Sequence, residues 1–203
     1  MMRMLPGVSN GTWVDVGGGL ADGLAAGGDA LRMFTQVHAV HVGTAPPAAP
    51  AVDDAAATKP VHVRTHTVAS LDGDAAATIG VARGSADVVT ISHGLVAEAD
   101  WESRLALATS LLKPGGLLAV ADLATPTAAP PEAYMWRHAL GAIRAAFWGA
   151  ARPRGAAPHH GAVMAQLRAA TAEVHFDETP ASWPLGRSPL RASHFVYVGR
   201  TPA

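Results

Sequence analysis

Short apolar runs recur along the chain and predict the strands of a buried sheet. Residues 13–16 form a β-prone run, and residues 37–42 alternate between apolar and polar side chains. Residues 86–92 are apolar enough to be buried on both faces. Further strands are predicted at residues 61–68, 117–123, 174–176 and 194–199.

The segments between these runs predict helices. One covers residues 20–34, and another covers residues 100–112, where Asp100 is expected to act as the N-cap. The Lys-Pro-Gly-Gly turn at residues 113–116 ends the second helix. Strands that alternate with helices indicate an α/β fold, with a parallel sheet covered by helices on both faces. The remaining predicted helices cover residues 132–149 and 161–172.

The most informative stretch follows the first strand, where Asp15 leads into three glycines. Glycines permit a tight turn and let backbone N–H groups approach a ligand closely, because no Cβ stands in the way. A helix that begins behind such a turn adds a local positive end. Ligands of parallel sheets bind at the carboxyl ends of the strands, so we expect one crevice there. Its predicted members are Gly17, Gly18, Gly19, Ser92, His93 and Asp122.

Composition narrows the function classes. The 203 residues suggest one domain over residues 1–203, and 49% hydrophobic with 15% charged residues allow a real core. A net charge of −1 gives no electrostatic case for a nucleic-acid partner, and the absence of cysteine excludes disulfides, zinc–thiolate sites and a cysteine nucleophile. Apolar runs stay below the roughly 18–20 residues of a membrane span, and the start is no convincing signal peptide. We therefore expect a cytoplasmic enzyme.

The order of three motifs resembles the class I S-adenosylmethionine-dependent methyltransferases. The motifs are the acid and triglycine turn at residues 15–19, the Asp-Val-Val-Thr strand at residues 87–90 and Leu-Leu-Lys-Pro-Gly-Gly at residues 111–116. The resemblance implies a Rossmann-like sandwich with a mostly parallel seven-stranded sheet. It also implies S-adenosylmethionine as the cofactor and the activity of a methyltransferase.

A narrower similarity is to the methyltransferase half of betaine-lipid (diacylglyceryl-trimethylhomoserine) synthases. It rests on Thr-Ile-Ser-His-Gly-Leu at residues 90–95, Asp-Trp at residues 100–101, Phe-Trp at residues 147–148 and the closing residues 193–200. This similarity implies N-methylation of the homoserine amine of a betaine-lipid precursor. The implied partners are a lipid or small-molecule amine as substrate and a separate or fused aminocarboxypropyltransferase.

The resemblance also assigns cofactor-binding residues. Asp15 and the glycines Gly17 to Gly19 face the methionine moiety, and the backbone of Ser92 contacts the cofactor. His41 stands where relatives carry an acid for the ribose hydroxyls, although an imidazole cannot bridge a diol as a carboxylate does. Asp72 or Asp74 is the adenine-side acid. No catalytic residue is assigned; His93 either helps to deprotonate the acceptor amine or replaces an aromatic in the pocket wall.

Departures from the family keep other functions open. The proline-rich residues 43–60 replace a helix, and few residues precede the first strand, so the N-terminal cap helix of relatives is expected to be missing. The alternatives are a methyltransferase for another small molecule and a degenerate, non-catalytic domain that scaffolds a partner enzyme. Histidine clusters lack an accompanying carboxylate motif, so no metal is expected. Residues 134–148 predict either core packing or contact with a membrane surface.

Overall fold

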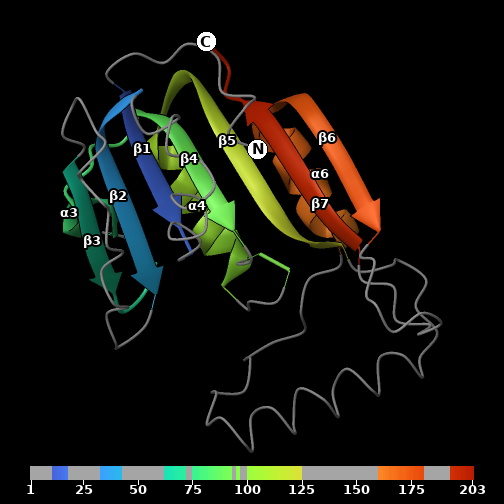
Figure 1. Ribbon diagram of the computed structural model, residues 1–203, viewed down its shortest axis with the longest axis horizontal. Coiled ribbons are helices and arrows are strands. Elements are labelled where there is room, and N and C mark those ends of the chain that lie inside the picture. Colours follow the sequence, from blue (N-terminus) through green and yellow to red (C-terminus); the bar gives the residue numbers. More distant parts are fainter. Residues whose placement is uncertain are drawn as a thin grey trace, which may run out of the picture.

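The computed structural model describes residues 11–17, 33–42, 62–71, 75–92, 95–96, 100–124, 160–180 and 193–203. Within this described part, seven strands form one sheet in the order β3-β2-β1-β4-β5-β7-β6 (Figure 1). The strands are β1 (Gly11–Val16), β2 (Phe34–Val42), β3 (His62–Val68), β4 (Ala86–Ser92), β5 (Leu112–Ala124), β6 (Ala172–Pro180) and β7 (Ser193–Arg200).

Strand directions confirm the predicted mostly parallel sheet. Strands β1 to β5 run parallel to one another, whereas β7 lies antiparallel between β5 and β6. The chain moves from β1 outward to β3 and then returns to place β4 on the other side of β1. This reversal makes a topological switch point, and ligands of such sheets bind there, at the carboxyl ends of the strands.

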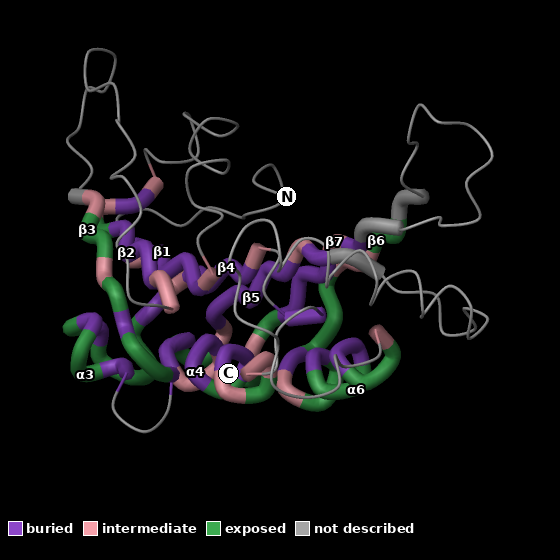
Figure 2. The backbone as a smooth tube through the Cα atoms, turned by 90° about the horizontal axis from the view of Figure 1, so that it is seen from below, coloured by how far each residue is buried: buried purple, intermediate pink, exposed green. Residues whose placement is uncertain are grey.

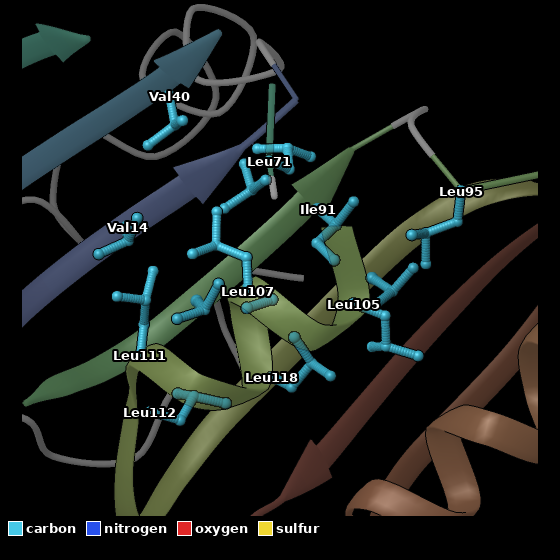
Figure 3. Close-up of a cluster of buried hydrophobic side chains, with 14 of the residues drawn as sticks. Val14, Val40, Leu71, Ile91, Leu95, Leu105, Leu107, Leu111, Leu112 and Leu118 are labelled. Carbon is cyan, nitrogen blue, oxygen red and sulfur yellow. The ribbon is translucent and has the colours of Figure 1, made fainter. Parts of the chain in front are cut away.

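The described helices lie on one face of the sheet (Figure 2). They are α3 (Ala75–Ile79), α4 (Trp101–Leu111) and α6 (His160–Ala170). In Figure 3, Leu107 and Leu111 of α4 lie against the strands that carry Val14 and Ile91, and all four belong to one buried cluster. Their spacing of four residues puts both leucines on the same side of α4.

A second buried cluster covers the opposite face of the sheet. It includes Trp13 and Phe34, whose ring centroids lie 5.6 Å apart, together with Val88 of β4. Since both faces are buried, the central strands lack the alternation of a half-exposed sheet, as expected for β4. The helix predicted over residues 132–149 and most of that over residues 20–34 lie outside the described residues, as does any N-terminal cap helix.

Several predicted boundaries were wrong. β2 begins at Phe34, which was expected to end a helix, because Phe34 is fully buried against Trp13. Asp100 makes no side-chain cap bond, since its carboxylate pairs with Arg104 instead. α6 begins at His160 and ends at Ala170, so it is shifted from the predicted range. β6 and β7 are longer than predicted because they pair with each other along most of their lengths.

The turn at residues 113–116 lies inside β5, where it forms a bulge, and not between α4 and a later strand. Leu112 already pairs with Ala86, and pairing resumes at Leu117 opposite Val88. Lys113 forms an ion pair with Asp87 at the start of β4. The turn therefore lies at the amino end of the parallel strands, at the opposite edge of the sheet from the predicted ligand crevice.

Candidate functional site

The carboxyl ends of β1, β2 and β4 meet at Gly17. Its N–H donates to the carbonyl of Val40 at 3.1 Å. Its φ of 130° is a backbone conformation that residues other than glycine rarely adopt. A Cβ on Gly17 would lie 3.4 Å from the carbonyl oxygen of Ser92 and 3.8 Å from Nη1 of Arg104. The structure thus brings together two predicted site residues, Gly17 and Ser92. Gly18 and Gly19 lie outside the described residues.

Asp15 is locked into the sheet directly before this bend. The hydroxyl of Thr90 donates to Asp15 Oδ1 at 2.6 Å and accepts a hydrogen bond from Trp13 Nε1 at 2.9 Å. Asp15 is 1% exposed, so its carboxylate accepts this hydrogen bond inside the protein, away from water. This network fixes β1 against β4 and hence the position of Gly17 relative to Ser92.

Asp122 holds the segment that follows β4. Its Oδ2 accepts hydrogen bonds from the backbone N–H groups of Leu95 at 2.7 Å and Val96 at 3.0 Å. Asp122 is 2% exposed, so these bonds are shielded from water. The sequence predicts Asp122 as a member of the crevice at the strand ends, and the structure shows that its carboxylate holds the loop after β4.

His41 lies at the carboxyl end of β2, in the residue after the Val40 carbonyl that receives the Gly17 N–H. Burial lowers the pKa of His41 from its usual value of 6.5, so the imidazole is neutral at pH 7. A neutral imidazole offers one donor and one acceptor. The predicted contact of His41 with the ribose hydroxyls stays a prediction. Asp72, Asp74 and His93 lie outside the described residues, so their predicted roles stay predictions.

Arg104 is a site residue that the sequence analysis missed. It sits in the first turn of α4 and is 8% exposed, with its Nε 3.1 Å from Asp100 Oδ1. The Asp–Arg spacing of four residues is a readable signal for this ion pair. The approach of the guanidinium to Gly17 is not readable, because it depends on how α4 packs beneath β1 and β4.

A second cluster of polar side chains lies one strand away, between β2 and β3. His38 Nδ1 is 3.1 Å from His66 Nε2, and the two rings are inclined by only 11° with centroids 5.3 Å apart. These values fit an in-plane N–H···N hydrogen bond. Burial, His66 and Arg64 together lower the pKa of His38 to about 4, so the pair is neutral at pH 7. No group of three or more metal-ligating side chains occurs among the described residues.

Comparisons with known proteins agree with this architecture. The ubiE/COQ5 methyltransferase family matches residues 4–139. YcgJ from Bacillus subtilis is similar in structure, with a TM-score of 0.63 and 14% identity, covering 100% of this chain and 97% of that chain. A putative methyltransferase from Bacillus halodurans gives a TM-score of 0.62 at 13% identity, covering 100% of this chain and 97% of that one.

A further structural neighbour is an arsenic(III) S-adenosylmethionine methyltransferase from Chlamydomonas reinhardtii. Its TM-score is 0.60 at 16% identity, and the similarity covers 97% of this chain and 65% of that chain. At these low identities, the TM-scores establish a shared fold and nothing more. No curated protein matches the chain in sequence. In the part of the chain that the structure describes, no helix is long and apolar enough to cross a membrane.

Proposed function

Since the chain belongs to the ubiE/COQ5 methyltransferase family and is an S-adenosylmethionine-dependent methyltransferase, we propose that it methylates an amine held above the carboxyl ends of β1 and β4. The observation that carries this placement is the bend at Gly17. It lies at the switch point of the sheet, where a Cβ would contact the Ser92 backbone at 3.4 Å.

The residues present fit a nucleoside cofactor with an amino-acid arm. The space beside Gly17 is bordered by the backbone of Ser92, and His41 adds one neutral hydrogen-bonding group at the end of the neighbouring strand. A hydrogen-bond network of Trp13, Thr90 and Asp15 supports the bend from inside the sheet. Among the described residues, backbone groups thus form much of this site.

When bound, S-adenosylmethionine supplies an electrophilic methyl group on a sulfonium sulfur. The acceptor amine would have to be held unprotonated, because only a free amine can take up that methyl group, and the cofactor would leave as S-adenosylhomocysteine. The contribution of the protein is to hold the two reactants in line at about 3 Å and to exclude water. The buried hydrogen bonds of Asp15 and Asp122 suit this role, because they fix both sides of the crevice.

For the acceptor, we propose the homoserine amine of a betaine-lipid precursor. Support comes from the Thr-Ile-Ser-His-Gly-Leu segment at residues 90–95 and from Trp101, which resemble the betaine-lipid synthases. Trp101 begins α4 and packs against the main buried cluster. This function would pair the chain with an aminocarboxypropyltransferase and bring it into contact with a lipid surface.

Titration calorimetry with S-adenosylhomocysteine tests the cofactor site. We expect saturable binding by the wild-type protein, and a loss of at least about tenfold in the Gly17→Ala variant, whose Cβ would stand on the side of the bend where the ligand is proposed to bind and whose φ of 130° would be strained. Gly80→Ala is the matched control, since Gly80 also has a positive φ but a Cβ there meets no atom within 4 Å. Absence of binding at millimolar ligand would remove the proposal.

Lipid extraction tests the acceptor. The chain is expressed in a host that makes the unmethylated diacylglyceryl-homoserine, and the methylated head group is sought by mass spectrometry. Appearance of the trimethylated lipid supports the proposal. Cofactor binding without any methylated lipid would instead favour a methyltransferase for another small molecule.

A non-catalytic scaffold is the second candidate, and the neutral His41 at the place of a ribose-binding acid favours it. A ligand that binds only the folded state must raise the melting temperature. A stable protein whose melting temperature is unchanged by any adenosyl ligand would support the scaffold.

A further inference from the structure

We infer that Arg104 binds the carboxylate of the methionine arm of the cofactor, an assignment that rests on the proposed function. The structure brings this guanidinium close to the glycine bend of β1 and to the end of β4. Arg104 is then a specificity-determining residue, because it distinguishes adenosyl ligands with a carboxylate from those without one.

The geometry begins at the missing side chain of Gly17. The position that its Cβ would occupy lies 3.8 Å from Arg104 Nη1, 3.4 Å from the Ser92 carbonyl oxygen and 4.0 Å from the Ser92 nitrogen. A ligand group placed against this side of the Gly17 backbone would therefore lie within van der Waals range of the guanidinium. The family resemblance implies that the methionine arm lies against this glycine bend.

Burial makes the cation unusual. The side chain of Arg104 is 9% exposed, whereas its partner Asp100 is 37% exposed, and they are joined through Nε at 3.1 Å. Charged side chains are rarely buried unless they are paired and hydrogen-bonded. Arginine is always protonated and presents a planar fork that matches a carboxylate. A buried arginine directed at the strand ends thus has the chemistry of an anion receptor.

The ligand has one group that fits. The carboxylate is the only anionic group of S-adenosylhomocysteine, and its ammonium would be repelled by the guanidinium. Arg104 also stands in the first turn of the 11-residue helix α4, whose positive end adds to the attraction for an anion. Both charges therefore favour the carboxylate at this place and the nucleoside farther along the strand ends.

A purely structural reading is the competitor. In that reading Arg104 ties α4 to the β1 bend and affects every ligand equally. The two readings differ in one measurable way: only a direct contact depends on whether the ligand has a carboxylate. A comparison of S-adenosylhomocysteine with its decarboxylated analogue therefore separates them.

The experiment is titration calorimetry of both ligands against wild type, Arg104→Gln and Arg104→Lys. We expect Arg104→Gln to weaken S-adenosylhomocysteine binding by about 10–100-fold and the decarboxylated analogue by less than about threefold. Arg104→Lys keeps the charge without the fork, so its selective loss should be smaller. Arg168→Gln is the matched control, because Arg168 on α6 pairs with Glu173 of β6 and its side chain is 55% exposed.

Equal losses for both ligands would overturn the assignment and leave the proposed function intact. Should Arg104→Gln fail to fold, the wild-type protein still decides, because a direct contact requires it to prefer S-adenosylhomocysteine over the decarboxylated ligand. Equal affinities in the wild type would refute the assignment. Binding of neither ligand by the wild type is a different result, which removes the proposed function together with this inference.

Discussion

Replacing Thr90 with valine removes one hydroxyl from the interior of the sheet while keeping the shape of the side chain. That hydroxyl accepts a hydrogen bond from Trp13 Nε1 at 2.9 Å and donates one to Asp15 Oδ1 at 2.6 Å. Trp13, Asp15 and Thr90 are each 1% exposed, so water has no access to the broken bonds. We therefore expect Thr90→Val to destabilise the protein although the volume is unchanged.

The magnitude follows from the two bonds. A buried donor without its acceptor costs about 1–3 kcal/mol, and a hydrogen bond to a charged group contributes about 1.5–3 kcal/mol. The new methyl group returns about 0.8 kcal/mol. The net loss is about 2–5 kcal/mol, which is a large part of the roughly 5–15 kcal/mol stability of a domain. It corresponds to a melting temperature lower by about 4–20 °C for a chain of this size.

The assay is urea denaturation followed by circular dichroism for wild type, Thr90→Val, Trp13→Phe and the double variant. Because Trp13→Phe already removes the indole N–H, Thr90→Val should cost about 1–2 kcal/mol less in that background. Thr65→Val on the exposed face of β3 is the control, with an expected effect within about 0.5 kcal/mol. A Thr90→Val variant as stable as wild type, or a strictly additive cycle, would refute this account of the network.

Three other predictions concern the rest of the described structure. The pKa of His38 is about 4 in the folded state against 6.5 when unfolded, so the unfolded chain binds more protons between these values and stability falls as pH drops from about 6.5 to about 4. The free energies of unfolding measured by urea titration at pH 7 and pH 5 should differ by at most about 2 kcal/mol because of His38. A His38→Gln variant that keeps the full difference would show that His38 is not its source. Asp122→Ala should lower the free energy of unfolding by about 2–4 kcal/mol and speed hydrogen exchange of the two backbone N–H groups that donate to Asp122. Asp122→Asn retains an acceptor and should lower the free energy of unfolding by less. Unchanged exchange in Asp122→Ala would show that other contacts hold the loop. Tyr197→Phe removes the buried 3.0 Å hydrogen bond to Thr171 and should lower stability by about 1 kcal/mol in thermal melts, with no effect expected if the bond is absent in solution.

The sequence predicted the parts of the fold that depend on local pattern. The apolar run at residues 86–92 forms β4 with the expected bounds, and the acid–glycine stretch forms a bend at the end of β1. Parallel strands could be inferred because strands and helices alternate. Gly17 and Ser92 could be placed at one edge by the same reasoning, since carboxyl ends of parallel strands coincide.

Contacts between distant residues could not be predicted in this way. Trp13 and Thr90 are separated by 77 positions, and their bond depends on the register of β1 against β4. The His38–His66 pair likewise depends on the register between β2 and β3, which the crossover connection sets. The interior support of the site and its buried arginine were therefore visible only in three dimensions.

The Lys-Pro-Gly-Gly turn at residues 113–116, one of the three motifs that carry the resemblance, lies away from the proposed site. The residues by which the fold is recognised are therefore not all residues of its chemistry. Gly115 has a φ of 72°, and the bulge it forms in β5 is held by the carboxyl-terminal tail: its N–H donates to the Pro202 carbonyl at 3.1 Å, and the Thr201 N–H donates to Gly116 at 3.0 Å. Lys113 pairs with Asp87, which also accepts the Thr12 N–H at 2.7 Å. This turn thus joins β1, β4, β5 and the tail at the amino edge of the sheet. Its constraint is structural, so changes there should act on stability, whereas changes at Gly17 and Arg104 should act on ligand binding.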